Sequence, residues 1–267
     1  MFFRQALLVA SLTFIFGGMV MAETIDSMAI GPRFHHETAF DDNGIKGQMI
    51  AFGQPEVLYK RYDQAPRIKL PAPSPDSTPL FAAMERRRSI RNFTAELVPF
   101  HDLARIIMAA DGITHSRQGF AMRTAPSGGA LYPIEIYLYA HQVDSLERGW
   151  YHFSPADSSL EFILPGDFRE ELYKASHEQS SVGNAPAALV LTACFNRSTK
   201  KYADRGYRYT YMESGSICQN IYLAAEALKL GTVAVGAFND DRLNALLDID
   251  GIREAALLIM PIGRPAE

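Results

Sequence analysis

The sequence predicts an α+β fold, in which a mixed or antiparallel central sheet is covered by helices. Helical and strand-like segments are mixed along the chain without strict alternation. Of the 267 residues, 48% are hydrophobic and 21% are charged, which excludes a disordered tail, a collagen-like fibre and a disulfide-stapled miniature protein. The formal net charge of -4 provides no global basic field, so we expect no nucleic-acid partner.

The first 22 residues are similar to a secretory signal peptide. Arg4 supplies one positive charge, residues 6–20 form an uncharged apolar run, and the small residue Ala22 precedes Glu23. Cleavage after Ala22 predicts an exported protein, periplasmic or extracellular. The alternative is an uncleaved N-terminal membrane anchor, although the run is shorter than the roughly 20 apolar residues that span a bilayer.

Residues 23–77 are predicted to form an irregular, proline-rich strap or linker. They show no sustained helical or strand period, and residues 65–79 contain five prolines. Proline fixes φ and removes the N–H donor, so this stretch should be extended and lie on the surface. We therefore place one compact domain at residues 78–267.

Helices are predicted at four places in this domain. Thr78 is expected to cap the first, with Pro79 in its first turn. The second covers about residues 99–111, because its apolar residues recur at i, i+3, i+4 and i+7. A long helix is predicted at 209–230 and a short one near 241–247.

Strands are predicted between these helices. Residues 134–140, 149–153 and 160–164 are joined by short connections, which indicates an antiparallel meander. Three further apolar segments of strand length are expected to be buried, at residues 187–195, 232–237 and 255–262.

An arginine run follows the first helix, with Arg86, Arg87, Arg88 and Arg91 placed around Ser89. One interpretation is a solvated basic run at a helix C-terminus, where the dipole favours cations. The other is an anion site, because guanidinium groups match phosphate oxygens in bidentate geometry. The run alone leaves both open.

Two further segments carry candidate chemistry. Gly128 and Gly129 precede a predicted strand and allow the backbone to approach a ligand closely, although most such segments are simple turns. Lys201 and Tyr202 are adjacent and offer two groups for proton transfer. The alternative for this pair is an ordinary surface dipeptide whose neighbours form ion pairs.

Five segments occur in a fixed order, and together they resemble the FMN-dependent nitroreductase superfamily, more narrowly its SagB-type dehydrogenases, which form thiazoles and oxazoles. The resemblance covers about residues 80–265. The segments are RRRSIRNF, TAPSGGALYPIEIYLY, KKYADRGYRYTYMESG, QNIYLAAEALKLGTVAVGAFND and PIGRP. The chain departs from the family at Ser216, where a histidine is common.

The resemblance implies a nitroreductase-like fold and an intertwined homodimer that binds FMN at the subunit interface. By motif, Arg87, Arg88, Ser89 and Arg91 are expected to hold the FMN phosphate, ribityl chain and N1 edge, with Arg264 as a further phosphate ligand. The partner subunit is expected to supply Pro126, Ser127, Gly128 and Gly129, while Gly236 and Ala237 lie along the ring. Lys201 and Tyr202 correspond to the pair that assists proton removal in azoline-oxidising relatives.

The predicted function is therefore an FMN-dependent oxidoreductase that transfers hydride through flavin N5 to or from a small-molecule or peptide substrate. The alternatives are an azoline-to-azole oxidase of peptide natural-product maturation and a non-catalytic FMN-binding protein. The dispersed histidines predict no metal site, and Ser127 lacks the setting of a hydrolase nucleophile. Cys194 and Cys218 are expected to be two buried thiols rather than a disulfide.

Overall fold

The structure, a computed structural model, describes residues 30–41, 44–45, 59–72, 78–117 and 120–266. Its centre is a seven-stranded sheet in the order β10-β11-β9-β6-β7-β8-β3, and every neighbouring pair is antiparallel. The strands are β3 (Arg67–Lys69), β6 (Ile134–Ala140), β7 (Gly149–Ser154), β8 (Ser159–Pro165), β9 (Ala187–Cys194), β10 (Gly231–Thr232) and β11 (Glu254–Gly263). The predicted α+β class and the β6-β7-β8 meander are thus confirmed.

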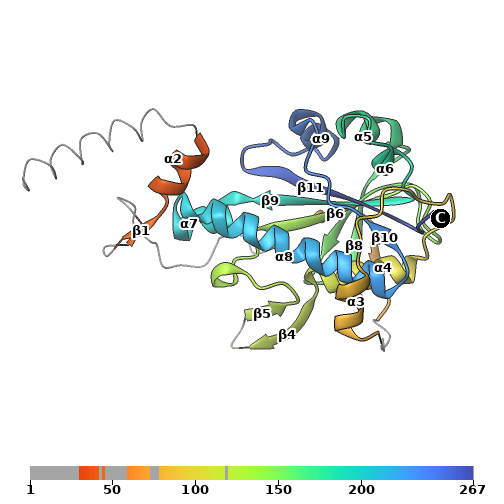
Figure 1. The fold of residues 1–267 in the computed structure, drawn as a ribbon, viewed down its shortest axis with the longest axis horizontal. Helices are drawn as coiled ribbons and strands as arrows, with labels where there is room; N and C mark the ends of the chain where they lie inside the picture. Colours follow the sequence, from red (N-terminus) through yellow and green to blue (C-terminus); the bar gives the residue numbers. More distant parts are fainter. Residues whose placement is uncertain (1–29, 42–43, 46–58, 73–77, 118–119, 267) are drawn as a thin grey trace, which may run out of the picture.

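Helices cover both faces of this sheet (Figure 1). One face packs on α4 (Phe100–Asp111) and α8 (Arg205–Ala227), and the other on α5 (Arg169–Ala175), α6 (Ser180–Gly183) and α9 (Asp240–Leu246). Strand β6 shows why both faces are buried: Ile136 and Leu138 belong to the first core, Tyr137 and Tyr139 to the second. Side chains alternate along a strand, so β6 divides its apolar residues between two cores.

Helix α8 runs along the sheet and begins at Arg205, four residues before the predicted start at 209. Tyr207 therefore lies within the helix as well, together with Tyr209 and Tyr211. Helix α7 (Phe195–Tyr202) was not predicted, and it ends at Ala203, whose φ of 47° breaks the helical path.

Two local predictions are corrected. Pro79 occupies the N-cap of α3 (Leu80–Arg86), not its first turn, and no side chain caps this helix. The predicted strand 232–237 is reduced to β10 and an isolated bridge between Val235 and Ile259. The sequence also gave no signal for the hairpin of β4 (Ile113–Arg117) and β5 (Phe120–Arg123), which leads into the glycine segment.

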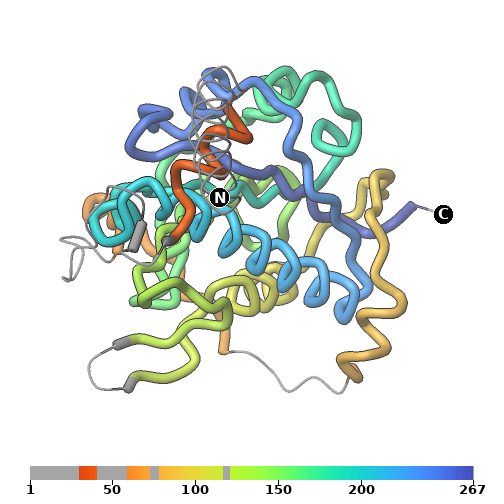
Figure 2. The backbone as a smooth tube through the Cα atoms, turned by 60° about the vertical axis from the view of Figure 1, so that its left-hand side comes forward, coloured from red at the N-terminus to blue at the C-terminus, as the bar shows by residue number. Residues whose placement is uncertain are grey.

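The segment predicted as an irregular strap contributes structure of its own. Strand β3 pairs with β8 at the sheet edge, and Lys60 forms a 2.6 Å ion pair with Glu254 of β11. Helix α2 (Ile30–Glu37) and the short pair β1 (Phe40–Asp41) and β2 (Gly44–Ile45) precede it. Figure 2 shows α2 beside the start of α8.

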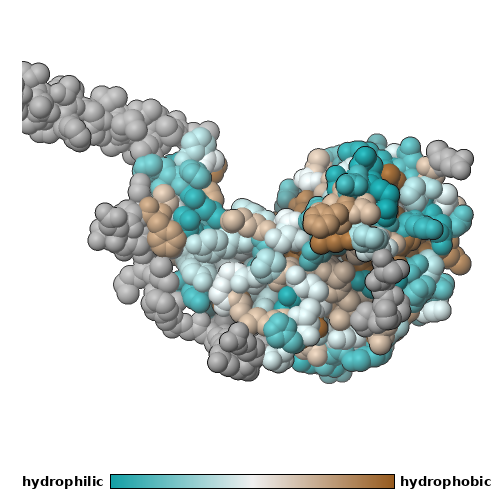
Figure 3. Space-filling view, turned by 60° about the horizontal axis from the view of Figure 1, so that its bottom comes forward, coloured by the Kyte–Doolittle hydropathy of each residue, from teal (hydrophilic) through white to brown (hydrophobic). Residues whose placement is uncertain are grey.

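The predicted signal peptide lies outside the described residues. Among the described helices, none is long and apolar enough to cross a membrane. Cys194 and Cys218 are free thiols, but both are half-buried rather than buried as expected. The face turned forward in Figure 3 mixes polar and apolar side chains. Helix α3 has three exposed apolar side chains, Leu80, Phe81 and Met84.

Candidate functional site

The structure gathers the predicted site residues into two groups. The arginine group comprises Arg87, Arg88, Ser89, Arg91 and Arg264, and segment 236–237 continues from the strand beside it. The glycine-loop group comprises Pro126, Ser127, Gly128, Gly129, Lys201 and Tyr202.

Tyr222 of α8 organises the arginine group. The Arg87 guanidinium lies over its ring, 4.9 Å from the centroid, and its hydroxyl is 3.0 Å from Ser89 Oγ. The same hydroxyl accepts a hydrogen bond from the Ala234 N–H at 2.8 Å. One phenol therefore joins the arginine turn to the segment that leads to Gly236, and sequence reasoning missed it.

A pocket of about 220 Å³ opens beside this turn. Four of its lining side chains are cationic, Arg86, Arg87, Arg88 and Lys229, against one carboxylate, Glu226. Glu226 is engaged by Arg86 at 3.0 Å. An excess of positive charge around a concavity of this size favours the anion-site interpretation over a plain solvated run.

Backbone pairing brings the last predicted ligand beside the same turn. The Thr94 N–H donates to Arg264 O at 2.9 Å, and the Ala266 N–H donates to Asn92 O at 3.0 Å. The Arg264 side chain, however, is engaged by Glu96, with 3.0 Å between Nε and Oε2. The backbone of Arg264 thus lies beside the arginine run, whereas its guanidinium group points to Glu96.

Arg91, Gly236 and Ala237 are exposed at this end of the molecule. A Cβ added to Gly236 would meet nothing closer than 3.8 Å, so the backbone there has open space around it. The Ala237 carbonyl accepts a hydrogen bond from Gln179 Nε2 at 2.8 Å, which holds the segment in place.

The glycine loop and the Lys201-Tyr202 pair are in direct contact. Gly129 has a φ of 70°, and a Cβ built on it would lie 2.7 Å from Tyr202 Oη and 2.8 Å from Lys201 Nζ. Gly129 and Lys201, which are 72 residues apart in the sequence, are therefore in contact where the backbone carries no side chain.

Tyr209 supports this contact from α8. Its ring meets that of Tyr202 edge-on, with centroids 4.9 Å apart, and it packs against Gly128. Its hydroxyl accepts a hydrogen bond from Arg205 Nε at 2.9 Å. Arg205 also donates to Thr38 O at 2.7 Å, so the segment after α2 is tied to the same support.

The two groups are not brought together within one chain. Tyr209 contacts the glycine-loop group and Tyr222 contacts the arginine group, and these two tyrosines are 13 residues apart on α8. At the helical rise this separation is about 20 Å. The glycine-loop group and the arginine group therefore lie toward opposite ends of helix α8.

Buried charges lie beneath the glycine loop, and sequence reasoning assigned them no role. Asp111 of α4 pairs with Arg123 of β5, and Glu213 of α8 is buried with no hydrogen-bond partner for its Oε1 atom among the described residues. Burial raises the pKa of Asp111 to about 7 despite the neighbouring Arg123, and burial raises the pKa of Glu213 to about 8. Both carboxyl groups titrate near neutral pH, which is common at functional sites.

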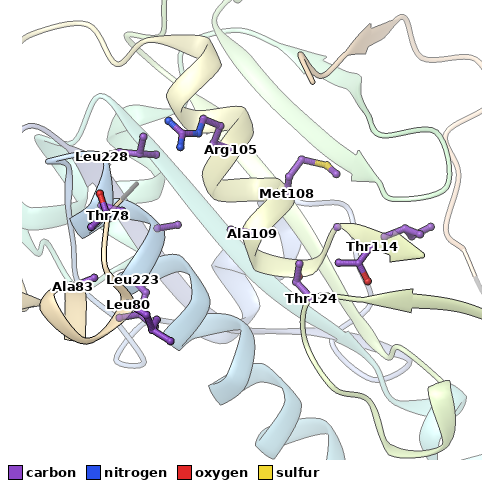
Figure 4. Close-up of a pocket in the computed structure, with 14 residues that line it drawn as sticks. Thr78, Leu80, Ala83, Arg105, Met108, Ala109, Thr114, Thr124, Leu223 and Leu228 are labelled. Carbon is purple, nitrogen blue, oxygen red and sulfur yellow. The ribbon is translucent and has the colours of Figure 1, made fainter. Parts of the chain in front are cut away.

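A separate apolar pocket of about 590 Å³ lies between α3, α4 and α8 (Figure 4). Leu80, Met108, Leu223 and Leu228 line it, and it contains none of the predicted site residues. In the described part of the chain no cluster of His, Cys, Asp and Glu has the arrangement of a metal site.

The comparisons with known proteins all indicate the same family. The model described as "Nitroreductase family" matches residues 84–264. A nitroreductase homologue from Methanocaldococcus jannaschii is 38% identical over 200 residues, 75% of this chain and 98% of the relative. The microcin B17-processing protein McbC of Escherichia coli is 27% identical over 201 residues, 69% of this chain and 74% of the relative.

Solved structures share the fold. A nitroreductase-like protein from Anabaena variabilis has a TM-score of 0.69 at 25% identity over 88% of this chain, which spans 47% of that protein. A chain of the E. coli McbBCD microcin synthetase complex, with truncated pro-MccB17 bound, has a TM-score of 0.59 at 25% identity, covering 73% of this chain and 77% of that one. A nitroreductase-like protein from Desulfovibrio desulfuricans in complex with FMN has a TM-score of 0.51 at 21% identity, covering 72% and 88%.

The family model spans most of the chain, from the end of α3 to the last residue of PIGR. The Methanocaldococcus relative is matched over nearly its whole length. The resemblance drawn from the five sequence segments is thereby confirmed, and the chain belongs to the nitroreductase family.

Proposed function

We propose that this protein is an FMN-dependent oxidoreductase that transfers hydride to or from a small-molecule or peptide substrate. Members of the nitroreductase family are flavin oxidoreductases, which supports the reaction class. The observation that carries the proposal is the contact of Gly129 with Lys201 Nζ and Tyr202 Oη. It sets two proton-bearing groups directly against the backbone of the glycine loop, which is where proton-transfer groups of a shared site would have to lie.

The residues present fit FMN. The cationic pocket beside Arg87 and Arg88 suits a phosphate, and the backbone at Gly236 has open space around it for a flat ring. When bound, FMN supplies hydride exchange at N5 of its ring.

Each side chain then has a definite task. Arg87 and Arg88 bind phosphate oxygens, and Ser89, held by Tyr222, adds a neutral hydrogen bond. Arg91 offers positive charge to the edge of the ring that becomes anionic on reduction. Lys201 and Tyr202 hold or accept the proton that accompanies hydride transfer.

A homodimer completes this arrangement. We propose that the glycine loop of one subunit faces the arginine group of its partner, with FMN at the interface. The support is the separation of the two groups by about 20 Å along α8 within one chain.

A second candidate is oxidation of azolines to azoles in a modified peptide. It is favoured by the 27% identity to McbC, a microcin-processing protein, and by a neighbour solved within a synthetase complex that holds a truncated pro-peptide. Neighbouring genes for a cyclodehydratase and a precursor peptide, and conversion of a synthetic azoline peptide, would select this reaction over small-molecule reduction.

The first test is flavin binding by the chain from residue 23 onward. Added FMN should remain bound through gel filtration, show flavin absorbance and raise the Tm. Absence of both the absorbance and the thermal shift would refute the proposal.

The second test separates an enzyme from a binding protein. Lys201→Gln and Tyr202→Phe should keep FMN but slow reoxidation of the dithionite-reduced flavin by a nitroaromatic acceptor by about 100-fold, the lower range for loss of an acid–base group. Equal rates in wild type and both variants would identify a non-catalytic FMN-binding protein.

We also propose that the protein is exported, on the strength of its first 22 residues. Native material should begin at Glu23 and fractionate outside the cytoplasm. A retained Met1 in the membrane fraction would instead identify an anchor.

A further inference from the structure

A ladder of charged side chains crosses one face of the sheet and is used by none of the tasks above. Glu135 of β6, His152 of β7 and Glu161 of β8 are buried, each with at most 4% of its surface exposed. His152 lies opposite Glu161 in the strand pairing, and Arg67 of β3 lies opposite Glu161 on its other side. We call these four residues the charge ladder, because positive and negative side chains alternate along it.

His152 is the centre of the charge ladder and carries a positive charge. Its Nε2 atom is 2.8 Å from Glu135 Oε2, and its Nδ1 atom is 2.9 Å from Glu161 Oε2. Carboxylate oxygens only accept hydrogen bonds, so both ring nitrogens donate, as they do in an imidazolium ring. At the outer end, Arg67 Nη2 lies 3.0 Å from Glu161 Oε1, and the Tyr62 N–H donates to Glu161 Oε2 at 3.2 Å.

The inner end of the charge ladder meets Arg197 of α7, which is also buried. Its Nη2 atom is paired with Glu135 Oε1, and its Nη1 atom donates to the Tyr132 carbonyl at 2.8 Å. Burial opposes the charge of Glu135, but Arg197 and His152 outweigh burial and lower the pKa of Glu135 to about 2. One guanidinium therefore joins an ionised ladder to the end of the glycine loop.

The glycine loop needs contacts of this kind, because its backbone is strained. Gly129, Ala130 and Tyr132 have φ values of 70°, 54° and 46°. Side chains disfavour this left-handed region, so the conformation persists where the surroundings hold it. The Tyr132 N–H donates to Ser127 Oγ at 2.8 Å within the loop, whereas its carbonyl is held from outside by Arg197. Arg197 thus ties the end of the loop to helix α7.

Helix α7 also carries the two candidate proton-transfer groups. Arg197 precedes Lys201 by four residues, about one helical turn, so both side chains lie on the same side of the helix. Lys201 Nζ and Tyr202 Oη are the atoms that flank Gly129 of the loop. The Arg197 guanidinium therefore fixes both partners of that contact, the helix that carries the pair and the loop that the pair meets.

We propose that Arg197 is a positioning residue that sets the Lys201-Tyr202 pair against the glycine loop. The charge ladder serves this role because it holds the Arg197 guanidinium at a fixed place between the sheet and α7. The importance of Arg197 for turnover rests on the function proposed above, whereas its hold on the loop and on α7 does not.

Backbone order in the flavin-free protein tests the hold directly. Arg197→Lys keeps a positive charge beside Glu135 but loses the fork that also reaches the Tyr132 carbonyl. NMR order parameters of amides 129–132 and 200–203 should fall from rigid values of about 0.85 to below about 0.6. Those of β6 and β9 should stay at their wild-type values.

A destabilised control separates this effect from a general loss of stability. Val182→Ala leaves a small cavity in the buried core at α6, away from the loop, and should lower the Tm without changing the order of the loop. Wild-type order in the loop of Arg197→Lys would overturn the proposal. An equal loss of order in Val182→Ala would overturn it as well, because the loop would then respond to stability alone.

A paired variant keeps the test decisive if Arg197→Lys does not fold. Glu135→Gln together with Arg197→Gln removes both charges of the pair, and a neutral His152 can accept a hydrogen bond from the amide that replaces Glu135. This variant should fold and show the same loss of order, since the shorter side chain at 197 no longer reaches the Tyr132 carbonyl. Rigid loop amides in this variant would refute the proposal.

Turnover adds a readout that a merely structural residue would not move. In the FMN-loaded enzyme, Arg197→Lys should slow reoxidation of the reduced flavin by the nitroaromatic acceptor about tenfold, the factor for one ordinary hydrogen bond, with unchanged FMN affinity. In an enzyme that already carries Lys201→Gln and Tyr202→Phe, the same substitution should slow the reaction no further.

The outcomes of the turnover test are distinct from a failure of the proposed function. A further tenfold loss in the Lys201→Gln, Tyr202→Phe background would show that Arg197 does not act through this pair and would overturn the catalytic part. A protein that binds no FMN but shows the expected loss of order in Arg197→Lys would refute the proposed function and leave the positioning role intact.

Discussion

Gly129 shows how one backbone conformation shapes the candidate site. Its φ of 70° lies in the left-handed region, and the space of its missing Cβ is taken by Tyr202 Oη and Lys201 Nζ. Both contacting atoms are ends of flexible side chains, which can move aside. A substitution there therefore strains the loop and displaces the candidate proton-transfer pair, rather than simply preventing folding.

Gly129→Ala should accordingly cost about 1–2 kcal/mol, through the left-handed conformation. For a domain of this size the Tm should fall by about 2–4 °C per kcal/mol. Turnover should fall much more than FMN binding, since Lys201 and Tyr202 move. Gly215→Ala, at a helical position with nothing near the added Cβ, is the control, and thermal melts with steady-state kinetics compare the two. A Gly129→Ala enzyme with wild-type kcat would contradict the assignment.

Buried titratable groups set the pH dependence of stability. Burial raises the pKa of Asp111 to about 7 and of Glu213 to about 8, above unfolded values near 4. Burial lowers the pKa of His152, but hydrogen bonds to Glu135 and Glu161 outweigh it and leave the pKa raised. In each case the folded state binds more protons than the unfolded state, so the free energy of unfolding falls as pH rises through the folded pKa.

The midpoint of urea unfolding should therefore decrease from about pH 5 to pH 8. Asp111→Asn cannot ionise, so it should show a shallower decrease than wild type, whatever its midpoint at pH 5. Unfolding curves at several pH values measure both slopes. A midpoint that rises over this range would show that these groups do not bind extra protons in the folded state.

At the scale of elements, α8 is the scaffold of both groups. Through Tyr209 it supports the glycine loop, and through Tyr222 it orders the arginine turn and the segment from Ala234. Its buried face, with Ile217 and Ile221, is fixed in the core beneath the sheet. A hydroxyl on this helix can therefore position a backbone segment that belongs to another element.

Tyr222→Phe should expose this role. The change removes the partner of Ser89 Oγ and leaves the Ala234 N–H without an acceptor, at a cost of about 1–3 kcal/mol. Because the ring remains to stack on Arg87, FMN affinity should fall moderately, by about tenfold, in a flavin fluorescence titration. Tyr211→Phe, whose side chain is half exposed on the same helix, should leave the affinity unchanged. Equal affinity in both variants would show that the hydroxyl does not order the flavin site.

Some helices and strands could be predicted from their own residues, whereas others depend on contacts with distant parts of the chain. Strands β6, β7, β8, β9 and β11 and helices α4 and α9 could be predicted because their apolar periods are continuous. Helix α7 (FNRSTKKY) has mostly polar residues, and the start of α8 carries alternating tyrosines, so neither shows a helical apolar stripe. Strand β3 is hidden between prolines, because it owes its place to pairing with β8 rather than to its own pattern.

At the scale of the whole molecule, the sequence motifs lead to the residues of the candidate site but not to their arrangement. The contact of Gly129 with Lys201 joins segments brought together by the fold of α7 and α8, and spacing alone does not encode it. Tyr222, Asp111 and Glu213 have no local signature, since their importance comes from burial and partners in three dimensions. The separation of the two groups likewise emerges from the length of α8.

That separation makes a prediction about the assembled protein. In a twofold dimer with FMN at the interface, each site takes the arginine group from one chain and the glycine loop from the other. A chain carrying Arg87→Gln and Arg88→Gln should be inactive as a homodimer, and so should Lys201→Gln. In a mixed dimer of these two variants, one site contains both sets of substitutions and the other site contains none.

The mixed dimer, isolated with two different affinity tags, should therefore recover about half of the wild-type activity per dimer. If each site were built within one chain, every site would carry one lesion and the mixed dimer would be as inactive as its parents. Bound FMN per dimer, read from the flavin absorbance, gives an independent count, because the intact site should retain FMN when the damaged one does not. The comparison thus decides, from activity and stoichiometry together, whether the two ends of α8 act in one site or in two.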